Sequence, residues 1–206
     1  MKEFVKHALK TLQMAWFAPL LILYGLSDRR SLIIADVERW AKLLSWPNSS
    51  PQTALLRLFS ECPEFRNLYY YRLEQGSLGV RLGMQVLKVF YPGCATLFID
   101  RTCNIGPGLF LQHAFSTIIM ADLGENCWIN QQVTIGYRDK SSRPWIGDNV
   151  RITAGAKVIG GVKIGNNVTV GANAVVVKNV PDDCVVVGVP AYIVRRNGVK
   201  VKEELV

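Results

Sequence analysis

An aliphatic residue recurs at every sixth position of this chain between Ile99 and Val176, with one exception and one interruption. The repeating positions are Ile99, Ile105, Leu111, Thr117, Leu123, Ile129, Ile135, Ile146, Ile152, Val158, Ile164, Val170 and Val176. Thr117 is the exception, and the interruption is the longer spacing from Ile135 to Ile146. A helix repeats about every 3.6 residues and a strand every 2, so this period belongs to neither alone.

The residue two places before each repeating position is also apolar or small. These places are held by Cys103, Leu109, Phe115, Ala121, Cys127, Val133, Val150, Ala156, Val162, Val168 and Ala174. Residues two apart lie on one face of a strand, so both are expected to point inward. Turn-formers such as Gly165-Asn166-Asn167 stand between the strands. A unit this small must stack on copies of itself, so the repeat predicts a parallel β-helix.

Motifs in and around the repeats match a known family, from about Ile33 to Val194. The matching segments are Asp36 to Trp40, Glu64 to Arg66, Ile105 to Gly108, His113, Gln131 to Gly136, Ile152 to Lys157 and Val187 to Ala191. On these residues the chain resembles the hexapeptide-repeat acyltransferases, within them the serine acetyltransferases and their polysaccharide O-acetyltransferase relatives. The resemblance implies a mainly β fold, with a left-handed parallel β-helix after an α-helical N-terminal domain. It also implies homotrimers, with hexamers left open, and acetyl-CoA bound in grooves between subunits.

The sequence before the repeats is expected to be helical. Proline at a first helical turn, apolar spacing and capping residues predict helices over 31–44, 51–59, 63–73 and 80–90. Pro92-Gly93 marks the expected boundary. The predicted domains are a helical domain for oligomerisation or membrane proximity over 1–93, the β-helix acyltransferase domain over 94–194, and a C-terminal tail over 195–206.

The first thirty residues combine the spaced lysines Lys2, Lys6 and Lys10 with an apolar run from Met14 to Leu26. That run is about half of the ~20 residues needed to span a bilayer, and no A-x-A-like cleavage site follows it. Neither a transmembrane helix nor a signal peptide is indicated. Two interpretations stay open: a helix packed in an oligomer core, and peripheral contact with the inner face of the membrane.

Cysteine usage and charge limit the compartment and the partners. The five cysteines show no CxxC spacing, which predicts reduced thiols in a cytoplasmic protein. The formal charge of +8 suits a nucleic acid, an anionic membrane or a phosphorylated small molecule. Arg151, Lys157 and Lys163 come one repeat apart and so face three sides of a coil, which argues against nucleic acid.

His113 is the only histidine in the repeats and occupies a corner position, so its imidazole is expected to point outward. Counted by eighteen residues and allowing for the interruption, its column contains Gln131, Ala154 and Ala172. From position alone, a solvated surface histidine is the more ordinary interpretation. The family resemblance implies instead a general base that takes the proton of an acceptor hydroxyl as the hydroxyl attacks acetyl-CoA.

The candidate residues for acetyl-CoA are Gly136, Ala154, Gly155, Ala172, Lys178 and Arg195. A pantetheine arm needs a flat wall with exposed backbone donors, which small residues such as Ala154, Gly155 and Ala172 supply. Lys178 and Arg195 are candidates for the phosphates by charge and by their place near the last coil. No metal is expected, because one histidine in the repeats cannot build a site of several histidines.

The interruption, residues 136–145, is a polar loop in a regular frame, and such loops commonly carry function. In the family this loop closes over the acceptor, which makes Tyr137 and Arg143 candidates for substrate binding. The carboxylate that the serine enzymes pair with their histidine falls on Phe98 here. Their acidic residue before the histidine is Gln112, which with Asp100 completes the candidates for the substrate; Asp100 is also the expected replacement for the missing carboxylate.

A free amino acid needs a carboxylate for its ammonium and a cation for its carboxylate, and only the cation is evident. The sequence therefore favours an acetyl-CoA-dependent O-acetyltransferase that acts on a sugar hydroxyl of a surface polysaccharide or its precursor, with His113 as general base. Serine O-acetyltransferase of cysteine biosynthesis is the alternative. A non-catalytic trimeric scaffold or binding module is the second alternative.

Overall fold

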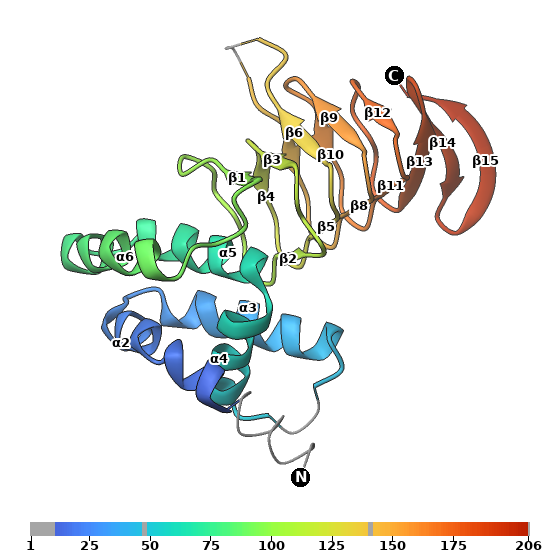
Figure 1. Cartoon of the computed structure of the whole chain (residues 1–206). Coiled ribbons are helices and arrows are strands. Elements are labelled where there is room, and N and C mark those ends of the chain that lie inside the picture. Colours follow the sequence, from blue (N-terminus) through green and yellow to red (C-terminus); the bar gives the residue numbers. More distant parts are fainter. Residues whose placement is uncertain (1–10, 47–48, 140–141, 206) are drawn as a thin grey trace. The chain divides into compact units, whose positions relative to one another are not determined.

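A computed structural model describes residues 11–46, 49–139 and 142–205 of the chain. It divides into two compact units, Met1–Cys94 and Ala95–Val206, helical and β respectively (Figure 1). In the described part, no helix is long and apolar enough to cross a membrane. Lys2, Lys6 and Lys10, on which the membrane expectation partly rests, lie outside the described residues.

The helical unit contains every helix that the sequence predicts. Residues 11–16 are helical, and α2 (Pro19–Leu26), α3 (Arg30–Leu43), α4 (Pro51–Glu61), α5 (Pro63–Glu74) and α6 (Leu78–Phe90) follow. Proline opens α2, α4 and α5, where its missing N–H leaves no helical hydrogen bond unmade. Ser50 caps α4, because its Oγ accepts a hydrogen bond from the Thr53 N–H at 3.2 Å.

The core of the helical unit joins α3, α4 and α5 through large buried side chains. Phe59 and Tyr69 meet edge to face with ring centroids 4.7 Å apart, and both are buried. The buried Asp36 of α3 accepts hydrogen bonds from the Arg72 guanidinium of α5 at 2.8 and 3.1 Å. Each of these contacts depends on one particular pair of residues.

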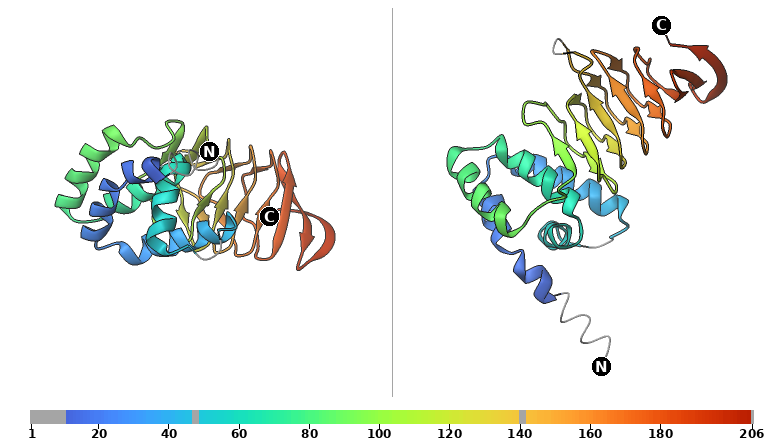
Figure 2. Two further views of the ribbon diagram at one scale, coloured as in Figure 1. Left: turned by 60° about the horizontal axis from the view of Figure 1, so that its bottom comes forward. Right: turned by 45° about the horizontal axis from the view of Figure 1, so that its top comes forward.

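The second unit is a parallel β-helix of short strands (Figures 1 and 2). Its strands are β1 (Leu97–Ile99), β2 (Phe110–Leu111), β3 (Thr117–Ile119), β4 (Asp122–Leu123), β5 (Trp128–Ile129), β6 (Thr134–Gly136), β7 (Trp145–Ile146), β8 (Arg151–Ile152), β9 (Lys157–Ile159), β10 (Lys163–Ile164), β11 (Thr169–Val170), β12 (Val175–Val176), β13 (Cys184–Gly188), β14 (Ala191–Arg196) and β15 (Val199–Glu204). They form three sheets: β1-β3-β6-β9-β12, β4-β7-β10, and β2-β5-β8-β11-β13 extended by β14 and β15. Their buried residues line the interior that the six-residue pattern predicts.

The corners between β-helix strands repeat from coil to coil. Asn149, Asn167 and Asp183 have φ values of 56°, 56° and 55°. Their side chains form a ladder, in which Asn149 Nδ2 donates to Asn167 Oδ1 at 3.3 Å and Asn167 Nδ2 donates to Asp183 Oδ1 at 2.9 Å. A Cβ on Gly165 would lie 2.6 Å from the backbone nitrogen of Asp182, so only glycine fits there.

The predicted frame is wrong at two positions of one corner, Thr117 and Phe115. Ile119, and not Thr117, lies in register with Ile99 and Ile135. The aliphatic column is therefore complete, and Thr117 was an exception only because the count ran through an irregular corner. Phe115, which the count places inside, is 46% exposed, while Ala114 is fully buried.

The irregularity is a corner with two additional residues between β2 and β3. From Leu111 to Ile118 the chain takes seven steps, whereas from Ile129 to Thr134, their partners in the next coil, it takes five. Thr117 closes the enlarged corner, because its buried Oγ1 lies 3.2 Å from the Phe115 carbonyl and 3.3 Å from the Asn130 carbonyl. This corner also carries His113.

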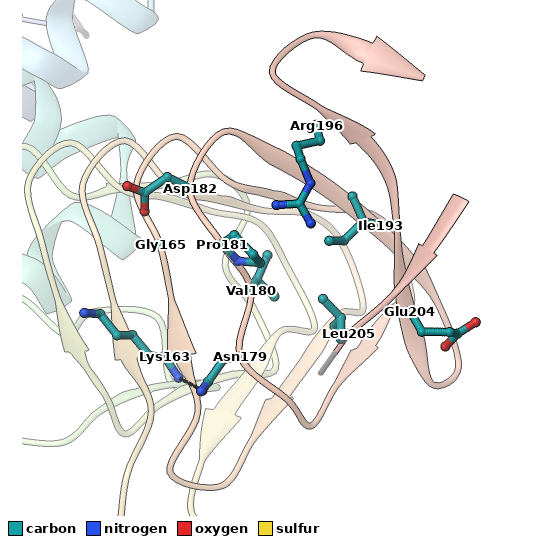
Figure 3. A pocket seen from close by; sticks show the side chains of 10 residues that line it. All are labelled: Lys163, Gly165, Asn179, Val180, Pro181, Asp182, Ile193, Arg196, Glu204 and Leu205. Atoms are coloured by element: carbon teal, nitrogen blue, oxygen red, sulfur yellow. Dashed lines mark hydrogen bonds between the residues drawn. The ribbon is translucent and has the colours of Figure 1, made fainter. Parts of the chain in front are cut away.

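The C-terminal residues do not form a separate tail within the described part. The expected boundary at 194/195 falls inside β14, which pairs antiparallel with β13 and β15. A cavity of about 350 Å³ lies between the β14–β15 hairpin and the preceding coil (Figure 3). Figure 3 shows the Arg196 guanidinium directed toward Val180 and Ile193. Arg196 also pairs with Glu203 at 2.5 Å.

The cysteines are free thiols, as their spacing predicts. Cys103, Cys127 and Cys184 are buried in the β-helix. Burial raises the pKa of the Cys127 thiol to about 12. Because the thiolate is the reactive form, Cys127 is a packing residue rather than a nucleophile at neutral pH.

Candidate active site

The sheet register places His113 in a column with three residues of the coils that follow. Leu111 pairs with Ile129, which pairs with Ile152, and each begins the same corner. Two residues further on in each coil stand His113, Gln131, Ala154 and, past Val170, Ala172. His113 is exposed, with a φ of 50°, at the enlarged corner. An exposed imidazole at this position is accessible to a bound acceptor.

Asp100 does not serve as the carboxylate partner of His113 in this structure. Its Oδ1 accepts hydrogen bonds from the N–H and the hydroxyl of Thr102 at 2.7 and 2.8 Å. The backbone hydrogen bond from Thr102 lowers the pKa of Asp100. Within 11–46, 49–139 and 142–205, no hydrogen bond or ion pair joins the His113 side chain to a carboxylate. Asp100 closes its own turn.

Gln112 belongs to a network of amides and an indole. Its Oε1 accepts from Trp128 Nε1 and from Asn130 Nδ2, both at 3.1 Å. Because an indole N–H only donates, the Gln112 atom facing it is the oxygen, and Asn130 must turn its amino group toward that oxygen. The opposite atom, Asn130 Oδ1, is then a buried acceptor without a hydrogen-bond partner, and so is Gln131 Oε1.

These two buried oxygens are site features that sequence reasoning missed. The available signal was a run of three polar residues, Asn130 to Gln132, at corner positions where the next two coils carry Thr153-Ala154-Gly155 and Gly171-Ala172-Asn173. The resemblance included Gln131 and Gln132 only as part of a motif. Their hydrogen-bonding state depends on side chains from other coils, which the sequence does not show.

Arg143 is held by the β-helix and not free in the loop. Its Nη2 lies 2.9 Å from Asp122 Oδ1, and its Nε donates to Asp122 Oδ2 at 3.2 Å. Its Nη1 donates to the Thr102 carbonyl at 3.0 Å. The cation expected to bind a substrate carboxylate is therefore already paired. Tyr137, at the other end of the loop, is exposed.

Some main-chain groups of the small residues in the column already form hydrogen bonds between coils. The Gly155 N–H donates to the Gln131 carbonyl at 3.0 Å, so it is not the exposed donor expected for pantetheine. The Ala154 carbonyl accepts from Asn173 at 2.9 Å. With a φ of 74°, Gly155 occupies a conformation that favours glycine. Ala172 is exposed.

A second cavity, of about 310 Å³, adjoins the loop. Lys178 and Arg138 line it together with Gly160 and Gly161. Lys178 Nζ donates to the Leu205 carbonyl at 2.9 Å. The Gly136 carbonyl contacts one residue that lines this cavity, because it accepts a hydrogen bond from the Gly160 N–H at 2.9 Å.

Arg195 is not among the residues that line this second cavity, and it stands exposed on β14, opposite Lys200 of β15. Of the two cations assigned to phosphates, the structure therefore brings only Lys178 close to the loop. Within the described ranges, no group of three or more His, Cys, Asp or Glu side chains is placed to hold a metal ion.

Residues 143–178 match the family model described as bacterial transferase hexapeptide (six repeats). The solved serine acetyltransferase of Neisseria gonorrhoeae superposes with a TM-score of 0.67 at 28% identity, covering 88% of this chain and 72% of that one. The chain has the left-handed β-helix of the hexapeptide-repeat acyltransferases. The resemblance and the fold class expected from the sequence are thereby confirmed.

Relatives of this hexapeptide-repeat chain are similar over about half of its length. A serine acetyltransferase of Synechococcus elongatus is 43% identical over 103 residues, which is 48% of this chain and 42% of that protein. A serine acetyltransferase of Staphylococcus aureus is 46% identical over 103 residues, 48% of each. The chain spans about half the length of these relatives. A structure of the Neisseria enzyme in complex with serine has a TM-score of 0.63 at 29% identity, covering 85% of this chain and 74% of that one.

The expectation of a polysaccharide acceptor is wrong. The relatives and solved structures above are named serine acetyltransferase, which favours the alternative that the sequence left open. The inference relied on missing carboxylates at Phe98 and Gln112. It failed because an uncharged oxygen also accepts hydrogen bonds from an ammonium, so the lack of a carboxylate does not exclude an amino acid.

Proposed function

We propose that this chain is an acetyl-CoA-dependent O-acetyltransferase whose acceptor is the hydroxyl of serine. The observation that carries the proposal is the exposed position of His113 on a corner of the β-helix. The chain is 43% and 46% identical, over 103 residues each, to two proteins named serine acetyltransferase. A solved neighbour at 29% identity was determined with serine bound. A serine acetyltransferase has also been solved with coenzyme A.

In the proposed reaction His113 is the general base. Its imidazole takes the proton of the serine hydroxyl while the hydroxyl oxygen attacks the thioester carbon of acetyl-CoA. The carbon–sulfur bond then breaks, and the departing thiolate takes the proton from the imidazolium. A positioned base of this kind typically contributes about 10²- to 10⁴-fold in rate.

The cofactor is proposed to lie along the column and the loop. Ala154 and Ala172 offer the small surfaces that a pantetheine arm requires, with Gly155 next to Ala154 in the same corner. Lys178 and Arg138, which line the cavity of about 310 Å³ beside the loop, supply cations for the phosphates. Gly136 ends β6 at the start of this loop, and Arg195 stays a candidate on β14.

The acceptor is proposed to contact Tyr137, Gln112 and Asp100, which stay candidates for this role. Arg143 binds the serine carboxylate only by sharing a guanidinium that Asp122 already holds with two contacts. An arginine has five N–H donors, so such sharing is chemically possible. The same pairing gives Arg143 a second role in fixing the loop to the β-helix.

A homotrimer is proposed from an apolar surface beside His113. Phe98 and Ile118 are register partners on β1 and β3 and are 49% and 40% exposed, and the exposed Phe115 follows His113 by two residues. Neighbouring exposed apolar side chains commonly mark an interaction site. A second subunit on this surface would bury them and bring its own residues close to His113. Light scattering of the purified protein measures the subunit number.

The exposed side of α6 supports a further contact of the helical unit. Leu78, Leu82, Val86, Val89 and Phe90 are all exposed on this helix. Two uses are proposed: pairing of trimers into hexamers, and peripheral contact with the inner face of a membrane through an apolar helix that also carries Arg81 and Lys88. Flotation of the protein with phosphatidylglycerol vesicles separates the second use from the first.

The reaction is tested by incubating the full chain with acetyl-CoA and serine and measuring O-acetylserine by mass spectrometry. Direct detection of the product is preferable to a thiol reagent, because the chain contains five cysteines of its own. The expected result is serine-dependent product that His113→Ala reduces at least about 100-fold. Absence of O-acetylserine from reactions with the folded protein overturns the proposal. Binding of coenzyme A without any turnover would favour the scaffold alternative instead.

A further inference from the structure

The imidazole of a general base needs a second hydrogen bond. One ring nitrogen receives the proton from the acceptor, and the other carries an N–H that an oxygen must hold if a single tautomer is to be maintained. Phe98 offers no such oxygen. The Asp100 Oδ1 is bonded to Thr102, and among the described residues no hydrogen bond joins either carboxylate oxygen of Asp100 to His113. Gln112 Oε1 already accepts two hydrogen bonds, from Trp128 and Asn130.

The nearest coil contains acceptors without donors. Three buried side-chain N or O atoms of the described residues lack a hydrogen-bond partner, and two of them are Asn130 Oδ1 and Gln131 Oε1. A buried acceptor left without a donor costs about 1–3 kcal/mol, so an N–H that reaches it is favoured by a comparable amount. Gln131 is the one that shares a column with His113.

The main chain between His113 and Gln131 is not hydrogen-bonded as it is in the later coils. In the later coils, main-chain hydrogen bonds tie the column together, from Gly155 N to the Gln131 carbonyl and from Asn173 N to the Ala154 carbonyl. The equivalent bond in the first coil would join Gln132 N to the His113 carbonyl, and it is not formed. The His113 carbonyl accepts from Phe115 N at 2.7 Å, within its own corner, and Gln132 N donates to the Phe115 carbonyl at 3.0 Å.

We propose that Gln131 is the positioning residue of His113: its Oε1 accepts the imidazole N–H that the base does not use. The paired strands β2 and β5, from which the two corners start, lie about 4.8 Å apart, and the contact requires the exposed imidazole to turn toward the next coil. The catalytic meaning of this contact rests on the proposed function. An amide holds the tautomer as a carboxylate does, but it carries no charge to stabilise the imidazolium.

The tautomer is measured directly by nitrogen-15 NMR of the imidazole rings in the full-length protein. The chain has two histidines, and His113→Ala assigns their signals. We expect one dominant tautomer of neutral His113 in the natural protein and a mixture in Gln131→Met. Gln132→Met is the matched control, because it changes the same residue type one position later, on an exposed side chain. An unchanged tautomer in Gln131→Met overturns the proposal and leaves a water or another group as the partner.

Kinetics provide the second measurement. Gln131→Met is expected to lower kcat about ten-fold at an unchanged KM for acetyl-CoA, in line with the loss of one hydrogen bond. Gln131→Glu keeps an acceptor oxygen and is expected to retain activity. Equal impairment of the Met and Glu variants contradicts a positioning role. If the natural protein acetylates no serine, the proposed function fails, whereas the NMR measurement still decides whether Gln131 holds His113.

Discussion

In the helical unit each stabilising contact occurs once, whereas in the β-helix the same contact recurs on successive coils. The Asp36–Arg72 pair and the Phe59–Tyr69 contact have no copies among the described residues. The ladder of Asn149, Asn167 and Asp183 instead repeats one corner three times. A repeat distributes stability over equivalent positions, so a departure from it stands out.

The corner that departs carries the candidate base. Its two additional residues expose Phe115 and place His113 at a positive φ, without the main-chain bond that ties the later coils of its column. The difference suggests a division of roles within the β-helix. Regular corners maintain the fold, and the irregular corner is available for chemistry.

The largest expected effect tests this division at the irregular corner. His113→Ala is expected to reduce serine acetylation by about 10²- to 10⁴-fold, because the base is removed. The free energy of unfolding should change little, since the side chain is exposed. Steady-state kinetics and chemical denaturation measure the two quantities. A large loss of stability with intact specific activity would reverse the assignment of roles.

A slightly smaller effect is expected from the unique contact of the helical unit. Asp36→Ala removes the carboxylate that faces the buried Arg72 guanidinium and should lower the free energy of unfolding by about 3–5 kcal/mol. Urea denaturation followed by circular dichroism measures it. Glu61→Ala removes a partly exposed partner of Arg57 and serves as control, with an expected cost of about 0.2–0.5 kcal/mol. Similar losses in the free energy of unfolding for both variants would contradict the larger contribution expected of the buried pair.

Regular corners are tested by adding a single methyl group. Gly165→Ala would place a Cβ 2.2 Å from Asp182 Oδ1 and 2.6 Å from its backbone nitrogen, so the corner must shift. The expected cost is about 1–3 kcal/mol. Gly79→Ala is the control on α6, where no atom lies within 4 Å of the added Cβ, and it should stabilise by up to about 1 kcal/mol. The melting temperatures of the two variants are expected to shift in opposite directions, and shifts in the same direction would contradict this prediction.

The smallest effect is expected at Thr117, which closes the corner that contains the two additional residues. Thr117→Val removes the hydroxyl that bonds the carbonyls of Phe115 and Asn130, at an expected cost of about 1 kcal/mol. Because this corner presents His113, acetylation should also fall by a small factor, at unchanged KM for acetyl-CoA. Thr53→Val, which removes a hydroxyl that lies 2.9 Å from the Ser50 Oγ at the start of α4, is a control for activity and should leave kcat unchanged. Loss of stability without any change in kcat would show that the geometry closed by Thr117 does not affect catalysis.

Much of the fold was predictable because its physical causes are local. Proline and capping residues begin α4 and α5 at the expected positions. The six-residue period predicts the strands, and the interruption predicts the loop between β6 and β7. The column of His113 also followed from counting, since the register between β2, β5, β8 and β11 is regular.

The contacts of the site were not predictable to the same degree. The family resemblance of the loop predicts that Arg143 binds the substrate, yet Asp122 on β4 holds it. Asp100 was assigned to His113 from its position, yet it bonds Thr102. Such outcomes depend on which side chains meet across coils, and a sequence pattern gives the coil of a residue without the direction of its side chain.

The sequence by itself determined the β-helix, the helical unit before it and the single histidine on a corner, because period, turn residues and capping act over a few neighbouring positions. Only the tertiary structure decided that Ile119 replaces Thr117 in the aliphatic column. Two residues added before β3 are offset by a shorter corner after it, so the average spacing stays at six. It also decided which oxygens near His113 lack donors, since hydrogen bonds between coils join residues far apart in the chain.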